Sequence, residues 1–158
     1  MKPFTAMVLL SGVLVACSQS SDVVQDSAVR DWAPQIRAAN DVLLNQGDLG
    51  SIGEFFAASY VSHGRAGSAS GHEAISGFLT ALRTAFPDLV VETEVLNTAD
   101  NVVTWLRTSR GTHQGDFMGV SATGQELTWQ TMIVTRYEGE LIAEEWAVSD
   151  LGEVIRSQ

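Results

Sequence analysis

The chain of 158 residues has a single lysine, Lys2, and a single cysteine, Cys17. One cysteine excludes an intramolecular disulfide, and the chain beyond residue 17 offers no thiol for catalysis. Without Lys2, no lysine remains to form a Schiff base. Acidic residues outnumber basic ones by 19 to 9, so the net charge of −10 disfavours nucleic acid and anionic membrane surfaces as partners. Chemistry is left to carboxylates, histidines, tyrosines and hydroxyl groups.

The N-terminus has the pattern of a processing signal. A positively charged start precedes an apolar run over 4–15 that is too short to span a bilayer comfortably, and the run ends in Leu14-Val15-Ala16-Cys17. This ending resembles the lipobox of bacterial lipoproteins. The resemblance implies a signal peptide over 1–16 and a lipidated Cys17, and Ser18 implies sorting to the outer membrane, facing the periplasm. An ordinary cleaved signal peptide and a fortuitous apolar N-terminus are the alternatives.

Beyond a polar tether over 17–27, we expect one folded domain over 28–158. Apolar residues at helical spacing predict helices, and after Pro87 the period changes to two, which predicts strands. The expected helices are Ala28–Asn45, Leu49–Ala58 and His72–Ala85, and the expected strands are 89–97, 101–113, 125–137 and 140–149. A brief extended stretch, 60–63, and a Gly- and Ser-rich segment, 64–71, separate the second and third helices. This order predicts an α+β domain with three helices packed on one face of a curved antiparallel sheet.

Strand parity supplies the candidates for a site, because alternate residues of a strand share a face if no bulge intervenes. The residues that share a face are Val103, Trp105 and His113; Leu127, Trp129, Thr131, Ile133 and Tyr137; and Ile142, Trp146, Val148 and Asp150. We expect these faces to converge on one concave surface. An aspartate held against tryptophan would have a raised pKa, which suits Asp150 for proton transfer. Alternatively, Asp150 caps the turn over 151–155.

The other candidates also have structural explanations. His113 is either a pocket group or a turn residue bonded to the backbone, and the tryptophans are either a ligand platform or core. His63 is a residue of the surface or of the pocket rim. His63, His72 and His113 lack the i, i+4 spacing of a helical ligand pair, so the sequence predicts no metal site.

Four segments resemble the SnoaL-like polyketide cyclases, also called ester cyclases, of the nuclear-transport-factor-two-like superfamily. They are Ala85-Phe86-Pro87-Asp88-Leu89, Gly111-Thr112-His113-Gln114-Gly115-Asp116-Phe117-Met118-Gly119, Thr123-Gly124 and Trp146 with Asp150. The resemblance covers about residues 28–152 and implies a cone-shaped domain with His113 and Phe117 at the cavity mouth. It also implies ring closure by aldol condensation without metal or cofactor, with Asp150 at the position of the general acid/base and His113 as a polar pocket group.

These observations predict a cofactor-independent acid/base enzyme, a cyclase or isomerase, that acts next to a carbonyl of a small apolar substrate. Its expected catalytic residues are Asp150 and His113, and its expected pocket residues are His63, Trp105, Phe117, Trp129 and Trp146. The alternative is a non-catalytic envelope lipoprotein that binds a hydrophobic small molecule or a protein partner through the same cone. A weaker third alternative is a structural lipoprotein whose cavity is filled by its own side chains. In each case the chain would contact the membrane only through its lipid anchor, and an exposed sheet face favours a homodimer.

Overall fold

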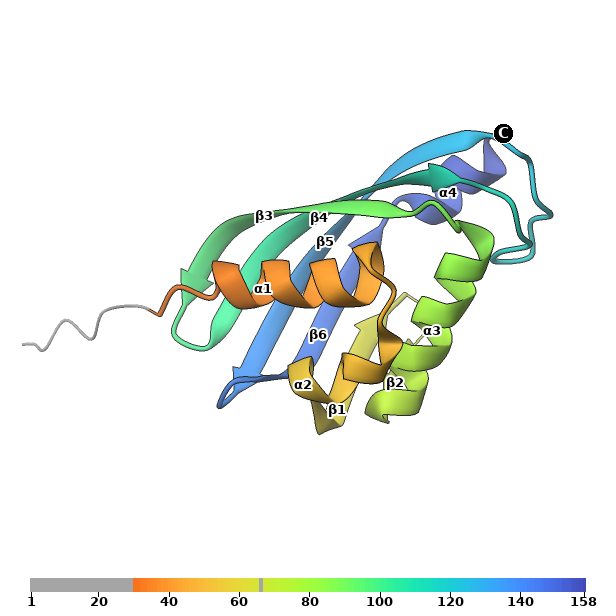
Figure 1. Ribbon diagram of the computed structural model, residues 1–158. Helices are drawn as coiled ribbons and strands as arrows, with labels where there is room; N and C mark the ends of the chain where they lie inside the picture. The colour runs from red at the N-terminus through yellow and green to blue at the C-terminus, as the bar shows by residue number, and fades with distance from the viewer. Residues whose placement is uncertain (1–29, 66) are drawn as a thin grey trace, which may run out of the picture.

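The computed structural model describes residues 30–65 and 67–158 as helices packed over one face of a bent, six-stranded sheet (Figure 1). The helices are α1 (Ala33–Asn40), which continues into a π-helical turn at Asp41–Asn45; α2 (Ile52–Phe55), which follows a 3₁₀ turn at Leu49–Ser51; α3 (Gly71–Ala85); and α4 (Leu151–Arg156). The strands are β1 (Phe56–Gly64), β2 (Gly67–Ser70), β3 (Val90–Ala99), β4 (Val102–Thr112), β5 (Glu126–Glu138) and β6 (Leu141–Ser149). The α+β class, the curved sheet and the helices on one face are confirmed.

The sheet has the order β2-β1-β6-β5-β4-β3. The four strands predicted after Pro87 are confirmed to within two residues at each end, as is the helix before it. One pairing departs from the expected antiparallel sheet, because β1 runs parallel to β6. The other neighbouring strands pair antiparallel.

The first half of the sheet was the less predictable half. The expected helix Leu49–Ala58 is wrong at its end, because the chain turns into β1 at Phe56. The segment Phe56-Ala57-Ala58 has no alternation of polar and apolar residues, and pairing with β6 outweighs its local preference. Strand β2 is exposed along its whole length, so no burial pattern could reveal it in the sequence.

The Gly-Thr-His-Gln-Gly segment ties the end of β4 to the end of α3. The carboxylate of Asp88 accepts hydrogen bonds from the backbone N–H and the hydroxyl of Thr112, both at 2.7 Å. The amides of Gln114 and Gly115 both donate to the carbonyl of Ala85, at 2.8 and 3.2 Å. We call these bonds the α3–β4 clamp. They fix the helix that covers one side of the cavity described below.

The glycines of this segment are needed for close backbone approach. A Cβ atom at Gly115 would lie 2.9 Å from the carbonyl oxygen of Thr84, and one at Gly111 would lie 3.2 Å from Cβ of Phe86. Real Cβ atoms essentially never come as close as the first distance. The clamp could not close with a side chain at Gly115.

The outer face of the sheet carries exposed apolar side chains. Met132 pairs across the strands with Val148, and Val134 with Trp146. Three of these four are largely exposed: Met132 and Trp146 at 42% each and Val148 at 63%. The homodimer expected from the sequence stays a prediction, and this patch is the surface that it would use.

The expected signal peptide, tether and lipidated Cys17 lie outside the described residues. Within residues 30–65 and 67–158, none of the helices has the length and apolar character needed to cross a bilayer.

We predict that Gly115→Ala lowers the free energy of unfolding by about 1–3 kcal/mol, the usual cost of overpacking against a rigid backbone. Gly77→Ala is the matched control, because Gly77 lies within α3 with nothing within 4 Å of its added Cβ. There the same substitution should stabilise by roughly 0.5–1 kcal/mol. Urea unfolding of both variants measures the difference. Equal stability of Gly115→Ala and the wild type would show that the clamp tolerates a Cβ.

Candidate functional site

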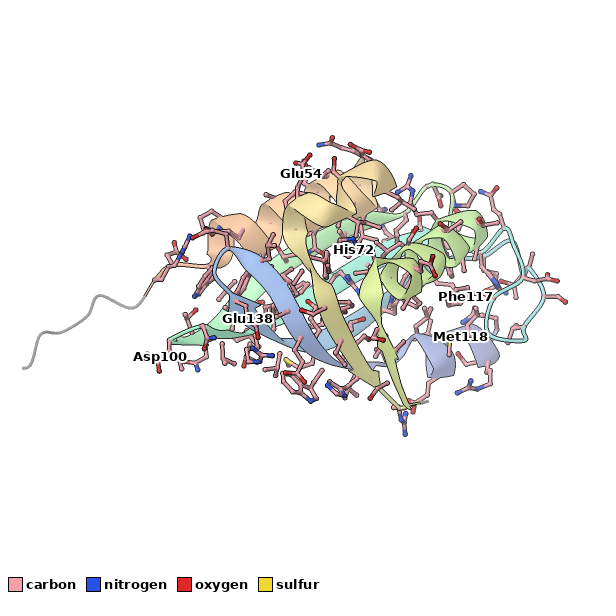
Figure 2. The ribbon with its side chains drawn as sticks, turned by 90° about the horizontal axis from the view of Figure 1, so that it is seen from below. Glu54, His72, Asp100, Phe117, Met118 and Glu138 are labelled. Atoms are coloured by element: carbon pink, nitrogen blue, oxygen red, sulfur yellow. The ribbon has the colours of Figure 1, made fainter. Side chains whose placement is uncertain are left out.

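A cavity of about 780 Å³ lies between the concave face of the sheet and the helices. Its walls are mainly apolar, and they include Ile36, Leu43, Phe56, Leu79, Trp129 and Ile133. Phe117 and Met118 also line it, from the loop after β4. This loop lies beside α3, at the end of the molecule opposite the turns at Asp100 and Glu138 (Figure 2). A largely apolar pocket of this size with a few polar groups is typical of a small-molecule site.

Four of the five predicted pocket residues line this cavity: Trp105, Phe117, Trp129 and His63, which is described below. Trp105 on β4 and Trp129 on β5 are buried against it, and Phe117 is buried in the loop that closes one end. Strand parity predicted this placement for both tryptophans, because no bulge interrupts the pairing of β4 with β5. Their contact with a ligand stays a prediction.

Trp146 does not line the cavity, and the expected shared face in β6 is wrong. Tyr137 pairs with Ile142 but Arg136 pairs with Glu144, so Ala143 is an extra residue that forms a bulge. A bulge shifts the alternation of side chains by one residue. Beyond Ala143 the inward positions are therefore Glu145, Ala147 and Ser149, all of which line the cavity. Trp146 and Val148 point to the outer face.

His63 contributes to the cavity wall, but its imidazole is bound elsewhere. In the pairing of β1 with β6 it lies beside Trp146, on which its ring stacks with centroids 5.1 Å apart. Its Nδ1 lies 2.8 Å from the hydroxyl of Ser68, and its Nε2 lies 2.7 Å from the carboxylate of Glu144. Glu144 also accepts hydrogen bonds from Arg136 on the outer face. The sequence left open a surface or a pocket-rim position for His63, and the residue lines the cavity while its imidazole binds Glu144.

Asp150 lies outside the cavity, contrary to the parity argument. It is exposed just after β6. Oδ1 of its carboxylate accepts a hydrogen bond from the backbone N–H of Gln130 at 2.7 Å. It occupies the N-cap position of α4, yet its side chain makes no capping bond. The first amide of α4, that of Leu151, donates to the hydroxyl of Ser149. The backbone carbonyl of Asp150 accepts from the amides of Glu153 and Val154. Asp150 therefore pins the end of β6 to β5, a role that neither alternative foresaw.

His113 is fully buried and does not line the cavity. Its ring stacks on Phe86 with centroids 5.3 Å apart, and Nδ1 lies 3.3 Å from the hydroxyl of Thr123. Nε2 has no partner within the described part of the chain. Its backbone N–H and C=O bind Gln125 and Gly124 across the turn. This geometry favours the structural alternative for His113 over the pocket role.

Glu145 is the cavity residue that sequence reasoning missed. Its carboxylate accepts hydrogen bonds from the hydroxyl of Thr135 at 2.8 Å and from the hydroxyl of Tyr60 at 2.9 Å. Nε1 of Trp105 donates in turn to the hydroxyl of Thr135 at 2.9 Å. We call Glu145, Tyr60, Thr135 and Trp105 the carboxyl network.

Burial dominates the electrostatics of the carboxyl network. Burial raises the pKa of Glu145 above its ordinary value of 4.5, although the bonds from Thr135 and Tyr60 and the positive charge of Arg107 oppose this shift. Burial likewise raises the pKa of Tyr60, which keeps its phenol a donor. Glu145 is thus a carboxyl group that holds its proton to higher pH than a carboxyl group in water does.

Only the pairing register of β6 with β5 shows that Glu145 faces the cavity. Thr135 lies opposite Glu145 and shares the inward face of β5 with Ile133 and Tyr137. Counting from Ile142 without the bulge assigns Glu145 to the outer face.

In the described segments, no group of three or more His, Cys, Asp or Glu side chains is arranged to hold a metal ion.

We predict a pH-dependent difference in stability between the wild type and Glu145→Gln. Because the pKa of Glu145 is raised on folding, its neutral form contributes stability that is fully present below the unfolded value of about 4.5. That contribution is lost as the pH rises through the folded pKa. Glutamine cannot ionise, so the variant should gain stability relative to the wild type between acidic and neutral pH.

Urea unfolding at pH 4, 5, 6 and 7 measures this gap. Glu126→Gln is the control, because Glu126 is 62% exposed at the start of β5 and should change little over this range. Parallel stability curves for the wild type and Glu145→Gln would show that Glu145 ionises as it does in water.

Known proteins share the fold that forms this cavity. The family model described as SnoaL-like polyketide cyclase matches residues 35–157. The structure of IdmH from Streptomyces antibioticus, assigned as a polyketide cyclase, is 25% identical, with 81% of this chain and 97% of that chain covered and a TM-score of 0.68. AclR from Streptomyces galilaeus, assigned as a hydroxylase, is 26% identical, with 78% and 90% covered and a TM-score of 0.64. A protein from Acidithiobacillus ferrooxidans assigned as a polyketide cyclase shares the fold at 18% identity, with 78% and 91% covered and a TM-score of 0.69. A search of curated proteins finds no significant match.

Proposed function

We propose, because the chain belongs to the SnoaL-like polyketide cyclase family, that it is a cofactor-independent acid/base enzyme acting next to a carbonyl of a small apolar substrate. The observation that carries this proposal is the half-buried carboxyl group of Glu145, which accepts hydrogen bonds from Tyr60 and Thr135, faces an apolar cavity and has a raised pKa. A general base is most effective when its pKa lies near the working pH. Glu145 therefore replaces Asp150 as our candidate for the catalytic residue.

The proposed reaction begins when the Glu145 carboxylate takes a proton from the carbon beside a substrate carbonyl. The electron pair of that C–H bond moves into the enolate, whose carbon then attacks a second carbonyl or is reprotonated at another position. Glu145 returns its proton to the oxygen or carbon that becomes negative, so the enzyme is unchanged after one turnover. Cyclisation, isomerisation and dehydration are all within reach of this chemistry.

The residues around Glu145 have supporting roles in this mechanism. The hydroxyls of Tyr60 and Thr135 hold the carboxyl group in one orientation, which reduces the entropic cost of proton transfer. Trp105 holds Thr135, and the aromatic walls keep out water that would solvate the carboxylate.

The alternative function is a binding protein that holds a hydrophobic molecule without reaction. The size and apolar lining of the cavity support it as well. One relative is assigned as a cyclase and another as a hydroxylase, so this fold hosts more than one activity. Catalysis of proton exchange separates the two functions.

We predict that the protein accelerates hydrogen–deuterium exchange beside the carbonyl of aryl ketones and linear 1,3-diketones that fit the cavity, as followed by NMR in D₂O. Glu145→Gln should lower the exchange rate by roughly 10²–10⁴-fold, because it removes the positioned acid/base and preserves shape. Glu126→Gln is the matched surface control and should keep the full rate.

Two other outcomes decide against this proposal. If Asp150→Asn abolishes exchange and Glu145→Gln does not, the assignment made from the sequence is right. If the ketones bind but the wild type gives no acceleration, the binding function is favoured.

We also propose that the mature chain begins at a lipidated Cys17 and is held at the bacterial outer membrane, facing the periplasm. The support is the lipobox-like ending of the N-terminal apolar run. We predict that mass spectrometry of the native N-terminus finds several acyl chains on Cys17, since one chain alone binds membranes only marginally. The Cys17→Ser variant has no thiol to lipidate, so it should be absent from the membrane fraction. A native N-terminus at any other residue, or an unmodified Cys17, would rule the anchor out.

A further inference from the structure

Arg107 is a cavity residue whose charge has no carboxylate partner. It lies on β4 two residues from Trp105 and opposite Thr131, and all three line the cavity. Within residues 30–65 and 67–158 it forms no ion pair, whereas Arg30, Arg110 and Arg136 each pair with glutamates on the surface. The result is a cation on an apolar cavity wall that is left without a counter-ion.

The hydrogen bonds of Arg107 are also largely unmade. Its one side-chain hydrogen bond in the described part of the chain runs to Oδ1 of Asn40 at 3.5 Å, which is the outer limit for such a bond. A guanidinium group carries five N–H donors in a planar fork. The guanidinium carbon of Arg107 also lies 5.9 Å from the centroid of the Trp105 ring, a contact that uses no N–H donor in a conventional hydrogen bond. Most of its donors remain available to a ligand.

Glu145 lies near enough for its charge to interact with that of Arg107, but the two side chains form no ion pair in the described residues. The carboxyl oxygens of Glu145 are occupied by the hydroxyls of Tyr60 and Thr135, and burial favours its uncharged form. Burial lowers the pKa of Arg107, but arginine keeps its proton in proteins. Leaving a charge without a partner on an apolar wall is costly, and a bound anion would relieve that cost.

We propose that Arg107 binds a carboxylate on the ligand, so that the cavity selects apolar molecules that carry an acid group. A carboxylate matches the guanidinium fork with two parallel hydrogen bonds, and the apolar part of the ligand would lie against the aromatic walls. The proposal rests on the proposed function, because it concerns the same cavity. It adds that the substrate is an acid, held by Arg107 within reach of Glu145.

The net charge of the chain makes this selection a local property. At −10 the protein as a whole repels anions, so a general attraction would not bring an acid into the cavity. Preference for a carboxylate must then come from an arginine of the cavity. Three arginines line it, Arg65, Arg107 and Arg156, and Arg107 is the only one of them that is not exposed to solvent. Surface arginines should not contribute.

The test uses calorimetric titration of the purified full chain with 2-naphthylacetate and with its neutral isostere, 2-naphthylacetamide. We expect the wild type to bind the carboxylate at least about tenfold more tightly, which is the usual effect of a charge-assisted hydrogen bond. Arg107→Gln should abolish this preference and leave the affinity for the amide nearly unchanged. Arg110→Gln is the matched control, because Arg110 lies on the same strand but is 61% exposed, and it should keep the preference.

Two results would overturn the inference. One is equal binding of carboxylate and amide by the wild type, which needs no variant to fold. The other is an equal loss of preference in Arg110→Gln and Arg107→Gln, which would indicate long-range electrostatics instead of direct contact.

Carboxylate binding by Arg107 and proton exchange by Glu145 can be lost independently of each other. The carboxylate preference should persist in Glu145→Gln, in which proton exchange is lost. If exchange on neutral ketones depends on Glu145 but no carboxylate preference exists, only the role of Arg107 is wrong. If the preference exists and exchange does not, the cavity binds acids without acting on them.

Discussion

The extra residue at Ala143 decides which side chains of β6 enter the cavity, and the site depends on it. Before the bulge Ile142 faces inward, and after it Glu145, Ala147 and Ser149 do so. Without the bulge, strict alternation from Ile142 would turn Glu144, Trp146 and Val148 inward and Glu145 outward. Bulges are known to re-aim side chains next to functional sites. In this protein one such irregularity decides that Glu145, and not Glu144, faces the cavity.

The two charged residues Glu145 and Arg107 both line the cavity but do not form an ion pair with each other. A buried carboxyl group and a buried guanidinium would neutralise each other if they met in an ion pair, and each would then be unavailable to a ligand. Here the hydroxyls of Tyr60 and Thr135 bind Glu145, while Arg107 makes one long hydrogen bond to Asn40 and lies near the ring of Trp105. The separation leaves one group able to exchange a proton and the other able to bind an anion. Both properties come at a cost in stability that the apolar walls must offset.

The segments that carry the family resemblance maintain the fold and do not carry the proposed chemistry. Asp88 and the Gly-Thr-His-Gln-Gly segment form the α3–β4 clamp, and His113 is buried behind the cavity wall. Gly115 is required because two backbone segments meet there. A motif of this kind identifies the architecture reliably, whereas the activity depends on the few polar side chains that face the cavity.

The sequence by itself determined the α+β class, helix α3 and the four strands after Pro87, because helical and alternating periods are local properties of the chain. It also determined that Trp105 and Trp129 face the concave side, since their strands pair without interruption. Only the tertiary structure decided the rest. Strand β1 pairs with β6 from the far end of the chain, β2 is an exposed edge strand that pairs with β1, and the bulge at Ala143 is defined by the register of β6 against β5. The inward position of Glu145 and the unpaired charge of Arg107 follow from that pairing and from burial, neither of which can be read from neighbouring residues.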